Sequence, residues 1–237
     1  PIPEFKANRI TLSTRIGKLS SFDDFYINDK GLFVLETTLS NFNQELYKRN
    51  SPRSVFTWLR AVHATWTSDS GKEWTEKFAK RNSGTYNNQY LVIDSKKFTR
   101  GEKPTTDLLW KIEQMPGITM SGDITDELVK DGYIPSINTP TYKELFELAG
   151  YPEKIASWGE DGHYWDYETS SRYTLMAREA PRINDFETFK KFMRYNNYKR
   201  DPYVHGDPGQ MILARYDLRS GNNPHYKKKM FGGLDVK

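Results

Sequence analysis

The side chains of this chain that could do chemistry are neutral polar groups and one arginine, placed where secondary-structure elements are expected to begin or end. The run Glu36-Thr37-Thr38 ends an expected strand, where a period of two puts Glu36 and Thr38 on the same face. Asn138 precedes a Thr-Pro pair at an expected helix start, and Arg172 precedes an apolar stretch. Such residues can hold an oxyanion or orient a carbonyl without titrating near neutral pH. Taken singly, each is read more simply as a strand threonine, a turn asparagine and a surface arginine.

The densest polar segment spans residues 81–89 and reads Arg-Asn-Ser-Gly-Thr-Tyr-Asn-Asn-Gln, directly before the apolar run 90–94. That strand would carry the polar side chains toward the protein interior. Buried amides and hydroxyls cost about 1–3 kcal/mol each unless they are hydrogen-bonded. The segment therefore predicts an internal polar network or the lining of a polar pocket. The alternative is a capped helix end followed by a turn.

The composition excludes several classes of protein and site. With 237 residues and 14% aromatic residues the chain is long enough for one globular domain, and we expect a single domain over 1–237. It contains no cysteine, no glycine-rich phosphate loop, no Gly-x-Ser-x-Gly elbow and no His-Glu-x-x-His motif. The four histidines have no metal-ligand spacing, so we expect no metal and no cofactor. His63 is expected to be a surface or boundary residue of a helix.

The positive charge is concentrated near one end of the sequence. Residues 199–237 contain eight Lys or Arg and four Asp, which equals the net charge of +4 of the whole chain. The run Lys227 to Lys229 is interpreted as solvated surface or, alternatively, as a weak attraction to anionic lipid or nucleic acid. The segment lacks the regular alternation of Arg and aromatic residues that is typical of an RNA-binding sheet, so we expect no specific nucleic-acid binding. No apolar run reaches the ~20 residues of a transmembrane segment.

Strand and helix patterns are interspersed without regular βαβ alternation, which favours a layered α+β architecture. Strands are expected at 25–27, 32–35, 90–94 and 118–120, with turns at 28–31 and 116–117. Residues 108–112 fit a strand or a helix equally well. Four helices are expected. The first starts at Ser51-Pro52, with Val55, Leu59, Val62 and Trp66 at helical spacing, and the second starts at Ser70, with Trp74 and Phe78 on one face. The third runs from Thr139-Pro140 to Gly150, and the fourth starts at Asn184-Asp185, with Phe186, Phe189, Phe192 and Met193 in the core.

Several segments together resemble the C-terminal part of the phospholipase B-like family of lysosomal N-terminal-nucleophile hydrolases. They occur in family order and span nearly the whole chain. The matching segments are Asp23-Asp-Phe-Tyr-Ile27, Leu35-Glu-Thr-Thr38, Asn82-Ser-Gly-Thr-Tyr-Asn-Asn-Gln89, Glu113-Gln-Met-Pro-Gly117, Met193-Arg-Tyr-Asn-Asn197, Asp201-Pro202, Ala214-Arg-Tyr-Asp-Leu218 and Gly232-Gly-Leu-Asp-Val-Lys237.

The resemblance implies an αββα four-layer sandwich, in which two antiparallel sheets lie between helical layers, completed by another chain. It also implies a precursor that cuts itself, so that a new N-terminal Cys becomes the nucleophile and its α-amino group the base. Thr38 resembles the family's pocket threonine, Asn138 the oxyanion asparagine, and Arg172 an arginine of the same pocket. The cluster Tyr86, Asn87 and Asn88 is expected to form the supporting network.

The chain departs from the family pattern because it has no Cys and begins at Pro1, after the position expected for the nucleophile. We interpret it as a processed product or fragment. Either a companion chain from the same precursor carries the N-terminal Cys, which we favour, or the lineage has lost catalysis.

The predicted function is therefore a subunit of a lysosomal or secreted amide or ester hydrolase acting on lipid-derived acyl substrates. The alternatives are a catalytically inactive protein that binds lipid or another ligand, and a binder of anionic surfaces.

Overall fold

Two compact units, Pro1–Ala149 and Gly150–Lys237, make up the chain in the computed structural model. The structure describes residues 4–14, 17–18, 23–222, 225–234 and 236–237, so that Pro1 and Asp235 of the motifs above lie outside the described residues. The single domain expected over 1–237 stays a prediction.

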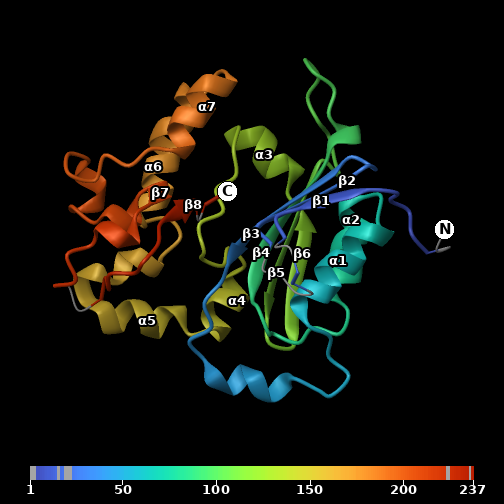
Figure 1. Ribbon diagram of the computed structural model, residues 1–237, viewed down its shortest axis with the longest axis horizontal. Helices are drawn as coiled ribbons and strands as arrows, with labels where there is room; N and C mark the ends of the chain where they lie inside the picture. The colour runs from blue at the N-terminus through green and yellow to red at the C-terminus, as the bar shows by residue number, and fades with distance from the viewer. Residues whose placement is uncertain (1–3, 15–16, 19–22, 223–224, 235) are drawn as a thin grey trace. The chain divides into compact units, whose positions relative to one another are not determined.

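The first unit is built on a six-stranded sheet in which every strand pairs antiparallel with the next one along the chain (Figure 1). Its strands are β1 (Ile10–Leu12), β2 (Phe25–Asn28), β3 (Leu32–Thr38), β4 (Asn88–Asp94), β5 (Leu109–Met115) and β6 (Ile118–Asp123). The predicted hairpin of β2 and β3 is confirmed. The undecided segment 108–112 belongs to strand β5, and the predicted turn at 116–117 joins β5 to β6.

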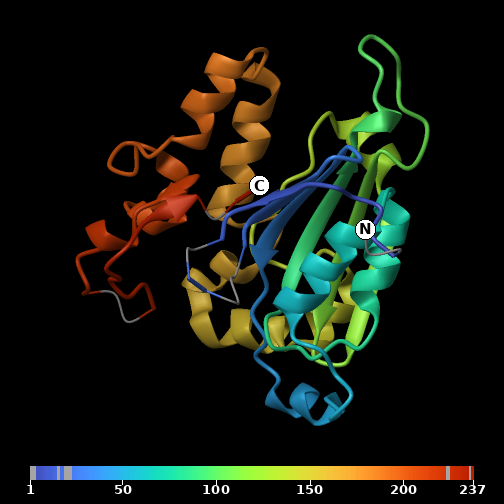
Figure 2. The same cartoon turned by 45° about the vertical axis from the view of Figure 1, so that its right-hand side comes forward.

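Helices α1 (Thr57–Thr67) and α2 (Gly71–Ala79) cover one face of this sheet (Figure 2). Helix α2 begins as predicted, because the Ser70 side chain accepts a hydrogen bond from the N–H of Glu73 at 3.3 Å. Trp74 and Phe78 are fully buried against Tyr90, as expected. The largest apolar side chains of α2 thus form the centre of this core.

The predicted start of α1 at Ser51-Pro52 is wrong. Val55 instead forms an isolated bridge with Asn82, which holds the chain extended until the helix begins at Thr57. Leu59, expected in the core, is 44% exposed, while Ala61 and Ala64 are fully buried. Ala61 and Ala64 are thus the fully buried apolar residues through which α1 joins the core.

The other face of the sheet carries a smaller apolar cluster. Leu91 and Leu109 pack there with Ile124 and Leu128, at and just before helix α3 (Thr125–Asp131). The predicted start of the next helix at Thr139-Pro140 is wrong, and α4 (Lys143–Leu148) begins only after Tyr142. The reason is a buried carboxylate, Glu113 on β5, which accepts hydrogen bonds from the N–H and the hydroxyl of Thr141 at 2.8 and 2.6 Å.

The second unit is mostly helical, with one two-stranded sheet. Its α-helices are α5 (Tyr151–Trp158), α6 (Ser171–Glu179) and α7 (Phe186–Met193), and its strands are β7 (Leu213–Ala214) and β8 (Gly233–Leu234). Short 3-10 helices are η1 (Gln44–Arg49) and η2 (Ser95–Lys97) in the first unit, and η3 (Gly159–Trp165), η4 (Ala180–Arg182), η5 (Pro202–Val204), η6 (Pro208–Gln210) and η7 (Tyr216–Leu218) in the second.

Helix α7 begins where predicted, at a capping box formed by Asp185 and Thr188. Its predicted core face is wrong, because Phe186 and Phe189 are 70% and 45% exposed and only Phe192 is buried. Helical periodicity identifies an apolar stripe, whereas burial needs a neighbour, and among the described residues the stripe of α7 is buried only at Phe192.

The α+β fold class predicted from the interspersed strand and helix patterns is confirmed, and the large sheet is antiparallel. The αββα sandwich needs a second large sheet. Among the described residues the only other sheet is the β7–β8 pair, so the four-layer arrangement remains a proposal.

Candidate functional site

The candidate site lies where β3 ends and β4 begins, on the face of the sheet that α1 and α2 cover. Alternation along β3 puts Glu36 and Thr38 on one face, as predicted, and the Thr38 hydroxyl donates to Glu36 Oε1 at 3.1 Å. The register pairs Thr38 with Asn88 and Glu36 with Tyr90. The apolar core of this face thus continues into a polar cluster at the strand ends.

Glu36 is buried, and its carboxylate is the centre of this cluster. The side-chain amide of Asn88, in the orientation that satisfies both of its polar atoms, donates to Glu36 Oε1 at 2.9 Å and accepts from the Tyr90 hydroxyl at 3.0 Å. The Tyr86 hydroxyl lies 2.6 Å from Thr38 Oγ1. Burial raises the pKa of Tyr90 well above its ordinary value, so this phenol remains a hydrogen-bond donor at all physiological pH values.

Asn138 comes to the same place from 100 residues further along the chain. Its side-chain Nδ2 donates to the backbone carbonyl of Thr38 at 3.0 Å. Two residues earlier, the Ser136 hydroxyl lies 2.6 Å from that of Thr37, on the opposite side of β3. Asn138 has a left-handed backbone with φ of +70°, a conformation that asparagine tolerates better than most residues. The structure therefore brings Thr38 and Asn138 into direct contact.

Two polar atoms beside this cluster are buried without a hydrogen-bond partner in the described chain: Asn87 Oδ1, an acceptor, and Asn41 Nδ2, a donor. Asn87 is 6% exposed, and its backbone carbonyl accepts from the N–H of Leu39, one residue after Thr38. A buried polar atom without a partner costs about 1–3 kcal/mol. Both atoms are therefore places where a further group could form a hydrogen bond.

A buried network supports the cluster from behind. The Thr57 hydroxyl donates to the backbone carbonyl of Tyr86 at 3.1 Å, and the Gln114 amide donates to the same carbonyl. The Arg60 guanidinium donates to Gln114 Oε1 and Asn82 Oδ1, and its burial lowers its pKa to about 10. The segment 81–89 thus forms an internal network, the first of the two structures predicted for it.

One glycine makes this network possible. Gly84 has φ of +59°, and a Cβ placed on it would lie 2.5 Å from the Cα of Pro116 in the β5–β6 turn. Since any side chain there would collide with backbone, the close contact of the segment with the turn requires glycine.

Arg172 belongs to the second unit, where it lies in the first turn of α6 and is buried. Its Nη2 donates to the Gly209 carbonyl at 3.1 Å and to the Tyr216 hydroxyl at 2.6 Å. These contacts join α6 to the short helices η6 and η7. A place for Arg172 in one pocket with Thr38 stays a prediction.

Sequence reasoning missed Glu36 as the centre of the cluster, and it missed Tyr90 and Asn41. Period-two alternation back from Thr38 points to Glu36, so that signal was available. Asn41 has no such pattern, since it lies after the end of β3.

The remaining expectations concern surfaces and metals. Lys227, Lys228 and Lys229 are exposed, as both interpretations of that run require, and so is His63. The part of the chain that the structure describes contains no group of three or more His, Asp or Glu side chains able to hold a metal ion. None of its helices has the length and hydropathy needed to cross a membrane.

Comparison with known proteins identifies relatives over nearly the whole chain. The family model described as Phospholipase B matches residues 3–237. The chain is 40% identical over 216 residues to "Phospholipase-B 81" of Drysdalia coronoides and 40% identical to "Phospholipase B-like 1" of Homo sapiens, covering 91% of this chain in both cases and 38% of each relative. It is 36% identical over its full length to "Phospholipase B-like protein B" of Dictyostelium discoideum, covering 40% of that protein. The chain thus spans about two fifths of the length of these relatives.

Proposed function

This chain belongs to the phospholipase B family, and on that premise we propose that it is part of a hydrolase of lipid-derived acyl esters or amides. In this proposal it supplies pocket and oxyanion residues, while a companion chain from the same precursor supplies an N-terminal Cys. The two chains together would form the αββα sandwich, in a lysosomal or secreted enzyme.

The observation that carries the proposal is the contact between Thr38 and Asn138. The Asn138 amide Nδ2 donates to the Thr38 carbonyl at 3.0 Å. The side chain is therefore fixed in place, and an amide N–H is a donor suited to an oxyanion. Thr38 Oγ1 is held by Glu36 and Tyr86, so its hydroxyl also has a fixed position before any substrate arrives.

In the proposed reaction the thiol proton passes to the α-amino group of the companion's Cys, and the sulfur bonds to the acyl carbon. The negative charge on the carbonyl oxygen is stabilised by Asn138. The alcohol or amine then leaves with the proton from the amino group, and water hydrolyses the resulting thioester. The buried Asn87 Oδ1 would accept a hydrogen bond from an N–H of the companion chain, and this would satisfy the unpaired atom.

Neighbouring threonines offer a matched test on the protein isolated with its companion chain. Thr38 and Thr37 each have one hydroxyl contact of 2.6 Å, to Tyr86 and to Ser136, on opposite faces of β3. We expect Thr38→Val to lower turnover of an acyl ester by roughly ten- to hundredfold, and Thr37→Val to leave it near normal. Equal effects of the two substitutions would refute a pocket role for Thr38.

We propose as a second candidate an inactive protein that keeps the pocket to hold a lipid. Denaturing mass spectrometry of the native preparation separates the two. A co-purifying chain that begins with Cys, and that acquires an acyl group when turnover is trapped, supports the hydrolase. Without such a chain, retention of lipid in the pocket becomes the function to measure.

A further inference from the structure

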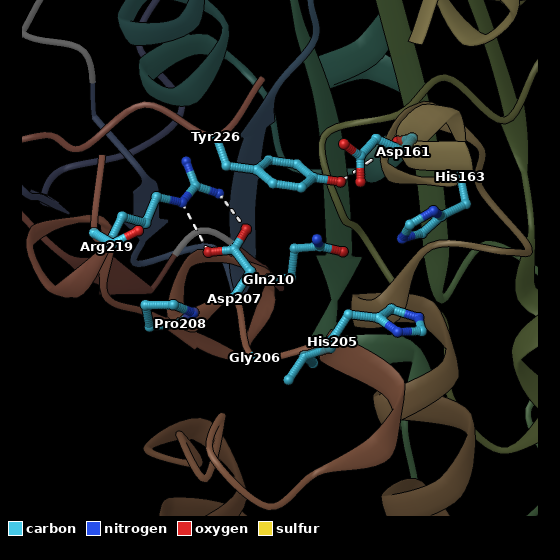
Figure 3. Close-up of a pocket in the computed structure, with 11 residues that line it drawn as sticks. Asp161, His163, His205, Gly206, Asp207, Pro208, Gln210, Arg219 and Tyr226 are labelled. Atoms are coloured by element: carbon cyan, nitrogen blue, oxygen red, sulfur yellow. Dashed lines mark hydrogen bonds and ion pairs between the residues drawn. The ribbon is translucent and has the colours of Figure 1, made fainter. Parts of the chain in front are cut away.

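A polar pocket of about 220 Å³ lies in the second unit, and its lining includes none of Thr38, Asn138 and Arg172 (Figure 3). Figure 3 shows the imidazoles of His163 and His205 beside one another on one side of it, and Arg219 with Asp207 on the other. His163 comes from η3, and His205 follows η5. The two rings come from segments about forty residues apart, and no pattern in the sequence joins them.

The hydrogen bonding of His163 fixes which nitrogen is available. Its Nδ1 lies 2.8 Å from the backbone carbonyl of Glu160. A carbonyl oxygen only accepts, so Nδ1 carries the hydrogen and Nε2 of the neutral ring has a lone pair. That Nε2 atom is buried and has no hydrogen-bond partner in the described chain. A backbone carbonyl on one nitrogen is the usual arrangement behind a metal-binding histidine.

The ring spacing suits a shared ion. The centroids of His163 and His205 are 5.8 Å apart, and the rings are inclined by 66°. With a metal–nitrogen distance of about 2.0–2.1 Å and a ring centre roughly 1.1 Å beyond the nitrogen, two imidazoles on one ion have centroids about 5.1 Å apart in tetrahedral geometry and about 6.3 Å apart when opposed. The observed separation lies between these limits.

The charges around the pocket also favour a cation. Arg219 is the guanidinium on the pocket wall, and its Nε and Nη2 donate to the two carboxylate oxygens of Asp207 at 2.8 and 2.7 Å. This ion pair is buried and neutral as a whole. Asp161 lines the same pocket and adds a negative charge.

From these observations we propose that His163 and His205 form a two-histidine site for a divalent transition-metal ion of the zinc class. Imidazole nitrogen is a preferred ligand for such ions. Since the described residues provide no third His, Asp or Glu in position, water completes the coordination, and the ion binds reversibly instead of serving as a structural metal. The proposal is independent of the hydrolase function.

The test is calorimetric titration of Zn²⁺ into the protein as isolated, near neutral pH. We expect one ion per chain, with affinity lowered at least about tenfold in His163→Gln and in His205→Gln. His63→Gln is the control, because that histidine is exposed on α1 in the other unit, and its loss should change nothing. Electron paramagnetic resonance with Cu²⁺ should detect two imidazole nitrogens in the wild type and one in each pocket variant.

Melting curves in chelator identify any variant that fails to fold. His205 is exposed, so His205→Gln still decides the question if His163→Gln is unstable. The proposal is overturned if Zn²⁺ does not bind up to about 1 mM, or if binding is equally strong in the pocket variants. In either case the two rings form an ordinary edge-to-face contact.

Discussion

Substitution of Asn138 can separate the role proposed for its amide from the effect of its backbone conformation. The φ of +70° is accessible to glycine without strain, whereas alanine in the left-handed region costs about 1–2 kcal/mol. Asn138→Gly therefore removes the amide and keeps the backbone. Asn138→Ala removes the amide and adds strain.

The two variants should differ in stability but not in turnover. Loss of the hydrogen bond to the Thr38 carbonyl costs about 0.5–1.5 kcal/mol in both. Strain makes the alanine variant less stable than the glycine variant by roughly 1 kcal/mol, after allowing for the flexibility that glycine adds to the unfolded chain. Loss of an oxyanion donor should lower kcat by about 10²–10³ in both, with KM little changed.

The assays are urea unfolding followed by circular dichroism, and initial-rate hydrolysis of an acyl ester by the protein with its companion chain. Asn43→Ala is a matched control, because that amide also donates to a backbone carbonyl, that of Leu148, at 3.0 Å. Because Asn43 Oδ1 also accepts from the N–H of Glu45 at 3.1 Å, this variant should lose at least as much stability and keep full turnover. Near-normal turnover of Asn138→Gly would refute the oxyanion role, and equal stability of the two Asn138 variants would refute the argument from backbone strain.

Three further predictions concern stability, each measured as the free energy of unfolding in urea. Gly84→Ala should cost at least about 2 kcal/mol more than Gly132→Ala, because both have positive φ but only Gly84 is in contact with backbone. Glu113→Gln should cost about 2–4 kcal/mol, because the buried carboxylate accepts hydrogen bonds from Gln89 and Thr141 and the new N–H₂ group would face these donors. Its control, Glu144→Gln on the surface of α4, should be nearly neutral. Burial alone would raise the pKa of Glu73, but hydrogen bonds from two lysines lower it to about 2. The stabilisation is then full above about pH 5 and is lost as the pH falls through about 2, so Glu73→Gln should cost about 1 kcal/mol at neutral pH and almost nothing at the acid end. An unchanged cost across that range would contradict this assignment.

The parts of the fold that follow from neighbouring residues could be predicted from the sequence. The β2–β3 hairpin, the Ser70 cap of α2 and the shared face of Glu36 and Thr38 depend on turn chemistry, capping and alternation over a few positions. The start of α1 could not be predicted in this way, because a bridge from Val55 to a residue beyond α2 overrides a good local capping signal.

The candidate site was predictable only in part, for the same reason. Thr38 and Asn138 are ordinary residues until the fold joins them across 100 positions, and beforehand only the family resemblance assigned them to one pocket. The exposed Phe186 and Phe189 show the converse limit, since they have helical spacing but the described residues leave them 70% and 45% exposed. The buried unpaired Asn87 Oδ1 is visible only once the neighbouring atoms are placed.

The strand order of the sheet also has a consequence for the rate of folding. Every strand pairs with the next one along the chain, and four of the five pairings close connections of only about two to fourteen residues. The exception is β3 with β4, separated by residues 39–87, which include α1 and α2. Since loop-closure entropy is lost before a distant pairing gives any stabilisation, this step should set the folding rate of the first unit. Substitutions that destabilise the α1–α2 pair should then slow folding more than they speed unfolding, whereas those in the β5–β6 turn should act mainly on unfolding.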